Sequence, residues 1–336
     1  MPPETTYGII SDVHRDPRIV APALDILKQL GAQKILVNGD IGERKRTLQE
    51  SQDFVARILQ ALGQSGLESR ISTGSHEAIA AFEPVLQYFS EKYPNLISIF
   101  KEPKIEETDH HVAFLPGSDF VCGGEYQIGS NESIPSGLYL QLDDRLHPYS
   151  PEAHRLLQNA GQLRGVLRYT NPNDLKKLVS EPEKTIVVCH VPRRFDGKEA
   201  VDVAYFSERP DKSIIPGVVV ESLLRQRYGT IHDEEISLLA TANGFPLRRE
   251  NRGNEHLQKL YQELGITKAV SGHFHESTHK AHDAAVQPVQ EGEFVDELYW
   301  NSGHLDVGHC GLLHVKDGKV AYQNVDLKEY MRQPRQ

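Results

Sequence analysis

This 336-residue chain has few cysteines, no excess of positive charge and no long apolar stretches. Its three cysteines, Cys122, Cys189 and Cys310, are far apart and form no CxxC pair, which argues against a disulfide framework and a thiolate zinc site. With 37 Lys and Arg against 47 Asp and Glu, the net charge is −10, which disfavours a broad surface for nucleic acid. No apolar run is long enough to cross a bilayer. The first strand is expected by Tyr7, so we expect no signal peptide, no membrane association and a cytoplasmic location.

What the chain has is an alternation of apolar runs and amphipathic stretches up to Phe89. Residues 7–11, 34–38 and 70–73 predict three buried strands. Each is followed by apolar residues at three- and four-residue spacing, which predict helices, and Thr47 with Glu50 has the form of a capping box. This β-α rhythm predicts a largely parallel sheet whose loops gather at one edge.

Beyond Phe89 the pattern loosens, and the expectations become local. Ser150, Asn171 and Asn254 are predicted to cap helices, and another helix is expected to start near Asp233. Residues 185–189 and 266–270 predict two further buried strands, and residues 316–318 predict a hairpin turn between antiparallel strands.

Side chains that bind metals stand at the end of each predicted buried strand. Asp12 and His14 end the first strand, and alternate residues of a strand share a face. The carboxyl ends of such strands are where α/β sheets place their ligands, and a carboxylate beside an imidazole suits a divalent metal ion. The sequence therefore predicts one rim that gathers Asp12, His14, Asp40, His76, His190, His273 and His275.

The ordered blocks are Asp12-x-His14, Gly39-Asp40, Gly74-Ser75-His76-Glu77, His190 and Gly272-His273-x-His275. This order resembles the calcineurin-like metallophosphoesterase superfamily, whose blocks read D-x-H, G-D, G-N-H-[DE], H and G-H-x-H. Each block is short and weak alone, and their order at successive strand ends makes the resemblance specific. It implies an α/β fold in which two sheets form a sandwich with helices outside (αββα).

The resemblance also implies two divalent metal ions, manganese first, with Fe, Zn, Ni or Mg as alternatives. Asp12, His14 and His275 would hold the first ion, Asp40 would bridge, and His190 with His273 would hold the second. His76 would act on the transition state or protonate the leaving oxygen, with Glu77 orienting its ring. The attacking group would be a hydroxide whose pKa the two ions lower.

One position departs from the family pattern. Ser75 stands where the family has an asparagine that binds the second metal. A serine hydroxyl is shorter than a carboxamide and a poorer ligand when neutral. Ser75 would therefore bind the second ion weakly, bind it through water, or not bind it.

Three arginines lie close to predicted ligands in the sequence. Arg15, Arg193 and Arg194 are candidates for holding a substrate phosphate, with a merely structural ion pair as the equal alternative. His304 follows a glycine turn of the kind that the family often has here, which would place it near the metals, but a surface position is the preferred expectation.

The whole chain, 1–336, is expected to form one domain, with insertions at about 118–180 and 196–252 that cap the metal rim. The resemblance implies a phosphatase or phosphodiesterase, and the negative charge favours a small soluble phosphorylated substrate over nucleic acid. Two alternatives stay open: a nuclease or RNA-processing phosphodiesterase, which needs an open basic groove, and a catalytically weak metal-binding scaffold. Ser75 mildly favours the scaffold and His76 argues against it. The oligomeric state is left open.

Overall fold

Two six-stranded mixed sheets lie at the centre of the computed structural model, which describes residues 4–119, 124–143, 145–209 and 213–332. The first sheet has the order β19-β18-β1-β2-β3-β4 and the second has the order β16-β17-β15-β11-β6-β5. In the first sheet the parallel strands are β1 (Thr5–Ile10), β2 (Lys34–Val37), β3 (Glu68–Ile71) and β4 (Leu96–Ser98), followed at the other edge by antiparallel β18 (His309–Lys316) and β19 (Lys319–Asp326). In the second sheet the parallel strands are β6 (His111–Leu115), β11 (Thr185–Cys189), β15 (Lys268–Ser271) and β17 (Leu298–Asn301), with antiparallel β5 (Lys104–Glu106) and β16 (Ala281–His282) at the edges.

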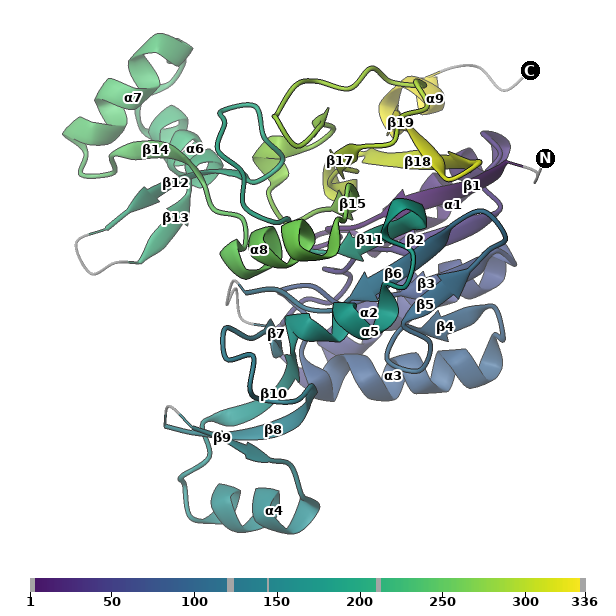
Figure 1. The fold of residues 1–336 in the computed structure, drawn as a ribbon. Coiled ribbons are helices and arrows are strands. Elements are labelled where there is room, and N and C mark those ends of the chain that lie inside the picture. The colour runs from purple at the N-terminus through teal and green to yellow at the C-terminus, as the bar shows by residue number, and fades with distance from the viewer. Residues whose placement is uncertain (1–3, 120–123, 144, 210–212, 333–336) are drawn as a thin grey trace.

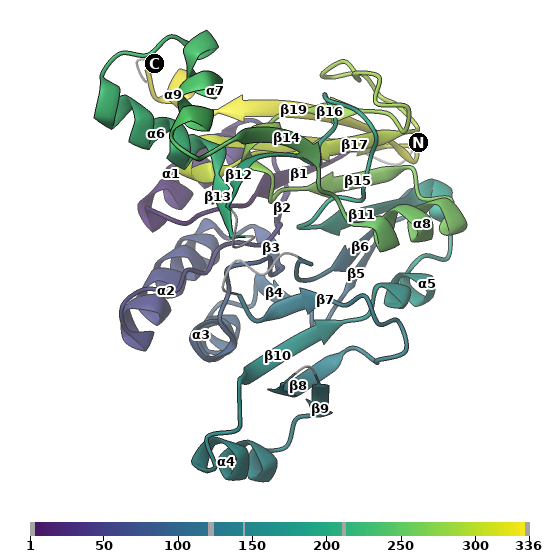
Figure 2. The same cartoon turned by 90° about the vertical axis from the view of Figure 1, so that its left-hand side faces the viewer.

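The two sheets pack face to face with helices on both outer sides, which confirms the predicted αββα sandwich (Figure 2). Alternation along β1 shows how the sequence builds these layers, because Ile9 points between the sheets and Ile10 points toward the helices. Against the first sheet pack α1 (Val20–Gln29), α2 (Leu48–Ser65) and α3 (Ile79–Lys92), and against the second pack α5 (Leu175–Leu178) and α8 (Glu255–Leu264). The short α9 (Leu327–Arg332) ends the described chain beside α1.

The predicted helix starts and turns are found where the side chains can make them. Thr47 accepts a hydrogen bond from the backbone N–H of Glu50, whose side chain accepts in return from Thr47, and this capping box opens α2. Asn254 caps α8 in the same way through the N–H of Leu257. The predicted hairpin turn joins β18 to β19, with Asp317 and Gly318 both at positive φ.

Two segments leave the sandwich and form lobes of their own (Figure 1). The first lobe contains β7 (Tyr126–Ile128), β8 (Gly137–Leu142), β9 (Arg145–Pro148), α4 (Pro151–Asn159) and β10 (Gly165–Thr170), in a sheet of order β7-β10-β8-β9. The second lobe contains β12 (Val203–Glu208), β13 (Ile214–Pro216), α6 (Gly217–Tyr228), α7 (Asp233–Ala242) and β14 (Leu247–Asn251), in a sheet of order β13-β12-β14.

The sequence predicted α4 and α7 but none of the strands in either lobe, and it missed α6. These strands are short and several are half-exposed, so no long buried apolar run marks them. The lobes extend in different directions from the sandwich in Figure 1, and a cap over the rim stays a prediction.

The sequence analysis expected no disulfide framework and no membrane-spanning segment. Cys189 and Cys310 are free and buried, while Cys122 lies outside the described residues. No helix in the described ranges combines the length and the apolar character that a bilayer crossing needs.

Candidate metal centre

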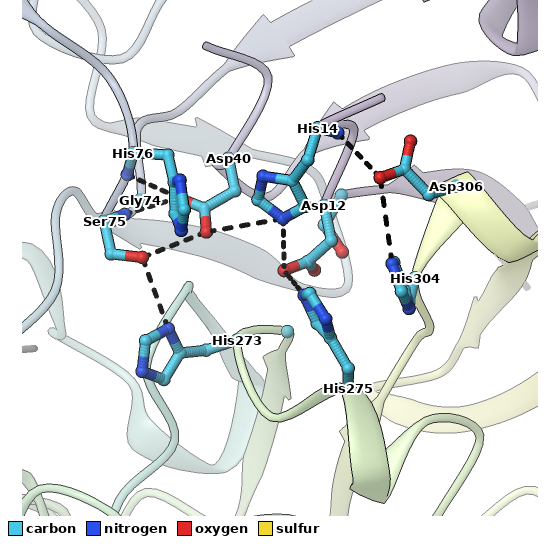
Figure 3. Close-up of polar contacts among 12 residues, drawn as sticks. Asp12, His14, Asp40, Gly74, Ser75, His76, His273, His275, His304 and Asp306 are labelled. Carbon is cyan, nitrogen blue, oxygen red and sulfur yellow. Dashed lines mark hydrogen bonds and ion pairs between the residues drawn. The ribbon is translucent and has the colours of Figure 1, made fainter. Parts of the chain in front are cut away.

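The loops that follow β1, β2, β3, β11 and β15 bring the predicted ligands together at one rim, as Figure 3 shows for most of them. His275 Nε2 lies 3.0 Å from Asp12 Oδ1, and His190 Nε2 lies 3.0 Å from Asp40 Oδ2. His14 Nε2 stands between the two carboxylates, 3.9 Å from Asp12 Oδ1 and 4.0 Å from Asp40 Oδ2. Ligand atoms within 4.8 Å of one another form three overlapping groups: Asp12 with His14 and His275, His14 with Asp40 and His76, and Asp40 with His190 and His273.

The backbone is strained where three of these side chains are presented. Asp12, Asp40 and His273 have φ values of 58°, 52° and 68°, a region that costs a non-glycine residue on the order of 1–3 kcal/mol. Hydrogen bonds from the N–H groups of Asp12 and Val13 to the carbonyls of Gly39 and Asp40 lock the first two loops together. Such strain persists where the surrounding structure enforces it, and here it aims both carboxylates at one point.

Two glycines make room for the cluster. A Cβ atom on Gly74 would lie 2.3 Å from Asp40 Oδ1, and one on Gly272 would lie 2.7 Å from Asp12 Oδ2. Any larger residue at either position would displace a carboxylate. The glycines of these two sequence blocks therefore have a steric function.

Some buried polar atoms of the cluster make no hydrogen bond, and their chemistry shows whether the residues fit metal ions. Asp12 Oδ2, His14 Nε2 and His190 Nε2 are buried and make no hydrogen bond; the 3.0 Å approach of His190 Nε2 to Asp40 lacks hydrogen-bond geometry. His190 Nδ1 donates to the carbonyl of Asn38 at 2.8 Å, so in the neutral ring Nε2 carries the lone pair. Imidazoles held in this way by a carbonyl or carboxylate are typical metal ligands. The donor set therefore fits divalent cations.

Charges within the cluster shift the pKa values of its members in the metal-free protein. Burial by itself would raise the pKa of the Asp12 and Asp40 carboxyls, but the neighbouring imidazoles, His190 foremost, lower both. Burial opposes charge on His14 as well, yet the neighbouring carboxylates of Asp12 and Glu43 raise its pKa to about 10. At His273 the balance is reversed, and burial with the nearby His190 lowers its pKa to about 3. His273 is therefore neutral over the physiological range, as a metal-binding imidazole must be.

Glu43, which the sequence analysis did not single out, is the carboxylate beside the predicted catalytic histidine. Its Oε2 lies 3.2 Å from Nδ1 of His76 and 3.2 Å from Nδ1 of His14. Burial would raise the pKa of Glu43, but its hydrogen bonds to these two rings lower it to about 2. Glu43 stays ionised and can orient both imidazoles.

Glu77, which was predicted to orient His76, contacts the backbone of two loops. Its two carboxylate oxygens accept hydrogen bonds from the backbone N–H groups of Ile41 and Gly74, each at 2.8 Å. Burial and the nearby Asp40 raise the pKa of Glu77 to about 7. Glu77 thus joins the loop after β2 to the loop after β3 and fixes the spacing of Asp40 and Ser75.

Ser75 contacts Asp40 and faces His273. Its hydroxyl donates to Asp40 Oδ2 at 3.0 Å and lies 3.5 Å from His273 Nδ1 (Figure 3). The backbone N–H groups of Ser75 and His76 both donate to Asp40 Oδ1. The loop after β3 therefore holds Asp40 in place, whether or not the hydroxyl also reaches a metal.

The three candidate substrate arginines have separate surroundings. Arg15 is exposed, and its backbone N–H donates to Asp306. Arg194 forms an ion pair with Glu255 at 2.7 Å, which is the structural alternative considered for it. Arg193 is buried, with its guanidinium 4.0 Å from the centre of the Phe195 ring and 4.4 Å from that of Tyr299. Contact of any of them with a substrate stays a prediction.

His304 and Asp306 belong to the rim, contrary to the expected surface position of His304. The ring of His304 stacks on that of His275, with centroids 3.8 Å apart and planes 17° apart. Asp306 accepts hydrogen bonds from the backbone N–H of His14 and that of Arg15, each at 3.0 Å. The glycine turn before His304 was a signal for this position, but nothing in the sequence indicated Asp306.

No protein-family model matches the chain, and no curated protein matches it in sequence. Among solved structures, a protein from Thermus thermophilus is 11% identical, with 96% of this chain and 99% of that chain covered and a TM-score of 0.48. A dimetal phosphatase from Danio rerio is 10% identical over 96% and 99% of the two chains, with a TM-score of 0.43. A predicted phosphoesterase from Streptococcus pneumoniae is 9% identical over 98% and 92%, with a TM-score of 0.32.

Likenesses this distant carry no argument about activity, which has to come from the residues of the rim. The αββα sandwich places all five ordered blocks, from Asp12 to His275, at the carboxyl ends of strands that meet at one rim. The chain therefore combines an αββα sandwich with the ordered blocks on which its resemblance to the calcineurin-like metallophosphoesterases rests, apart from Ser75 at the asparagine position.

Proposed function

We propose that the chain is a metal-dependent hydrolase that cleaves a phosphate ester of a small phosphorylated molecule. The observation that carries the proposal is the position of Asp40. Its carboxylate belongs to two of the three possible ligand groups, one with His14 and His76 and one with His190 and His273. A carboxylate shared in this way is what a pair of neighbouring divalent ions requires.

Asp12, His14 and His275 would hold one ion, His190 and His273 would hold the other, and Asp40 would touch both. When bound, two such ions lower the pKa of a coordinated water and neutralise charge on the phosphoryl oxygens during in-line displacement. Manganese is our first choice, and Fe, Zn, Ni and Mg are alternatives.

His76 would supply the proton for the leaving oxygen. Glu43 lies at its Nδ1, so Nε2 is the ring nitrogen from which a proton would reach the substrate. Glu43 would position His76 and His14 at once, since the same oxygen lies 3.2 Å from a nitrogen of each ring. Glu77 would keep the two loops in register through its bonds to Ile41 and Gly74.

Two observations favour a small substrate over nucleic acid. The net charge of −10 opposes a long phosphate backbone, and several basic side chains near the rim are already paired, as in Arg44 with Glu125 and Arg194 with Glu255. A nuclease remains the second candidate only if the lobes expose a basic groove. A metal-binding scaffold without turnover is the third, and the pairing of His76 with Glu43 argues against it.

The test compares p-nitrophenyl phosphate with bis-p-nitrophenyl phosphate after chelation and add-back of Mn, Mg, Zn, Ni and Fe(II). We expect hydrolysis that disappears on chelation and returns with at least one metal. The preferred substrate then assigns the enzyme to monoesters or diesters. Tight metal binding without turnover on either substrate would instead support the scaffold.

A further inference from the structure

A cavity lies away from the metal rim, on the outer face of the second sheet beside α8 (Figure 1 shows this helix). Its volume is about 420 Å³, which is in the range of small-molecule sites. The walls come from α8, from the loop of residues 284–286 and from the segment after His190, and Arg193 is among the lining residues.

Arg193 differs from the other buried arginine of the described residues. Arg193 is 6% exposed and Arg70 is 8% exposed, and these are the two buried arginines of the described chain. Arg70 forms ion pairs with Glu68 and Glu102, whereas no carboxylate of the described residues pairs with Arg193. Its Nε is buried without a hydrogen-bond partner. A buried charge without a counter-ion is costly, so Arg193 calls for an explanation.

Packing alone does not explain why a charged guanidinium occupies this buried position. Phe195 and Tyr299 face it, and the Tyr299 hydroxyl is close enough to interact with it. Stacking on two aromatic rings contributes less than the loss of hydration costs a buried cation, and a neutral chain of the same length would fill the space without that cost. What a guanidinium adds is paired donors that match a carboxylate or a phosphate.

The remaining lining residues narrow the choice of anion. Asp196 is exposed and Glu297 is half-buried, and both carboxylates line the same cavity. They repel a second negative charge on a ligand, which disfavours phosphate at neutral pH. Val286 and Ala285 offer an apolar wall, and Gln258 of α8 offers an uncharged polar group. We propose that this cavity binds a small organic monocarboxylate, whose carboxylate pairs with Arg193 and whose apolar body lies against Val286.

The proposal does not depend on the proposed phosphoesterase activity. Arg193 lies three residues after His190, but the cavity opens on the helix side of the sheet and its lining contains none of the predicted metal ligands. Binding is therefore expected to be the same in the presence and in the absence of a chelator.

The experiment measures binding of benzoate, and of inorganic phosphate for comparison, to the full chain by calorimetry. We expect saturable binding of benzoate and at least tenfold weaker binding of phosphate. Arg193→Met keeps an unbranched apolar chain at this position and removes the guanidinium and its charge, so benzoate affinity should fall at least tenfold. Arg194→Met is the matched control, because Arg194 already pairs with Glu255, and it should bind benzoate as the wild type does.

A second variant guards against misfolding of Arg193→Met. Gln258→Trp fills the cavity from α8 without touching the charge, and it should also abolish benzoate binding while circular dichroism stays unchanged. Absence of saturable benzoate binding to the wild type would overturn the proposal. Equal affinity of the wild type and Arg193→Met, or tighter binding of phosphate than of benzoate, would overturn it as well.

Discussion

The two predicted metal positions are built differently, although they share the same rim. At the first position, His14 and His275 are partly exposed and side chains brace them: Glu43 lies beside His14, and His304 stacks on His275. At the second position, Asp40 and His190 are buried and backbone groups hold them. The carbonyl of Asn38 accepts from His190, and the N–H groups of Ser75 and His76 donate to Asp40.

This difference indicates where each position tolerates change. A ligand held by side chains can be disturbed by altering one outer residue, since its orientation depends on that partner. A ligand held by backbone groups keeps its orientation, because substitutions other than proline leave those groups in place. The second position is thus the more rigid one, but Ser75 leaves it without the carboxamide that its family pattern would supply.

The largest effect is expected for Asp40→Ala, compared with Asp12→Ala. Asp40 belongs to two of the possible ligand groups and Asp12 to one, so Asp40→Ala should lose both ions and Asp12→Ala should retain one. Turnover of Asp40→Ala should fall by more than the roughly 10–100-fold that loss of an outer partner costs. Elemental analysis measures the number of bound ions, and hydrolysis of the better p-nitrophenyl ester measures turnover.

Asp53→Ala, on the exposed face of α2, is the control and should keep both ions and full activity. If Asp40→Ala retained two ions and normal turnover, Asp40 would not be shared by the two metal positions, and the proposed arrangement of the ligands would be wrong.

The sequence pattern predicted the rim because strand ends are positioned by regular structure, whereas the two-sheet sandwich was implied by the family resemblance. Asp12, Asp40 and His190 follow apolar runs whose parallel pairing fixes where their carboxyl ends meet. Glu43 was missed because it lies six residues beyond the end of β2, in a loop where no periodicity gives the direction of a side chain. Glu77 was assigned to its sequence neighbour His76, but the loop turns its carboxylate toward the backbone of Ile41 and Gly74.

The contact of His304 with the rim could not be predicted for a different reason. His304 reaches His275 because η5 (Leu305–Val307) and β18 return the chain to β1, and the N–H of Leu305 donates to the carbonyl of Ser11. That contact joins residues almost 300 positions apart, and local patterns carry no information about it.

The second prediction separates catalysis from metal binding at the rim. His76→Ala should lower turnover by roughly 10²–10⁴-fold while the metal content stays nearly intact, because the ring is expected to move a proton and not to hold an ion. The loss should be smaller for p-nitrophenyl esters than for alkyl esters, since p-nitrophenolate leaves without a proton. Equal losses for both leaving groups would mean that His76 stabilises charge in the transition state, and loss of metal would make it a ligand.

The third prediction tests the side-chain bracing of the first position. Glu43→Gln weakens the contacts to His14 and His76 together, so we expect a roughly 10–100-fold loss of turnover and weaker binding of the first ion alone. Calorimetric titration with the metal should show one of two binding steps shifted. Glu50→Gln is the matched control, because glutamine preserves the capping box of α2 and lies away from the rim. Weakening of both steps in Glu43→Gln would show that the two positions are not braced separately.

The smallest effect is expected at Ser75, where a substitution should increase the affinity for the second metal ion. The hydroxyl already donates to Asp40 Oδ2 and lies 3.5 Å from His273 Nδ1, so it stands beside the second position without the reach of a carboxamide. If Ser75 is a weak or water-mediated ligand, the second ion should dissociate first on dilution or mild chelation.

Ser75→Asn should then tighten the second binding step by a few-fold to about tenfold, because an amide oxygen can coordinate directly. Ser75→Ala is the matched control: it removes the hydroxyl, leaves the backbone donor to Asp40 in place, and should loosen the second ion only slightly. The contrary outcome is that Ser75→Asn lowers activity without any gain in affinity. Since Ser75 is buried against Asp40, that result would mean that the asparagine crowds the rim, and that serine is there to leave space for a substrate group.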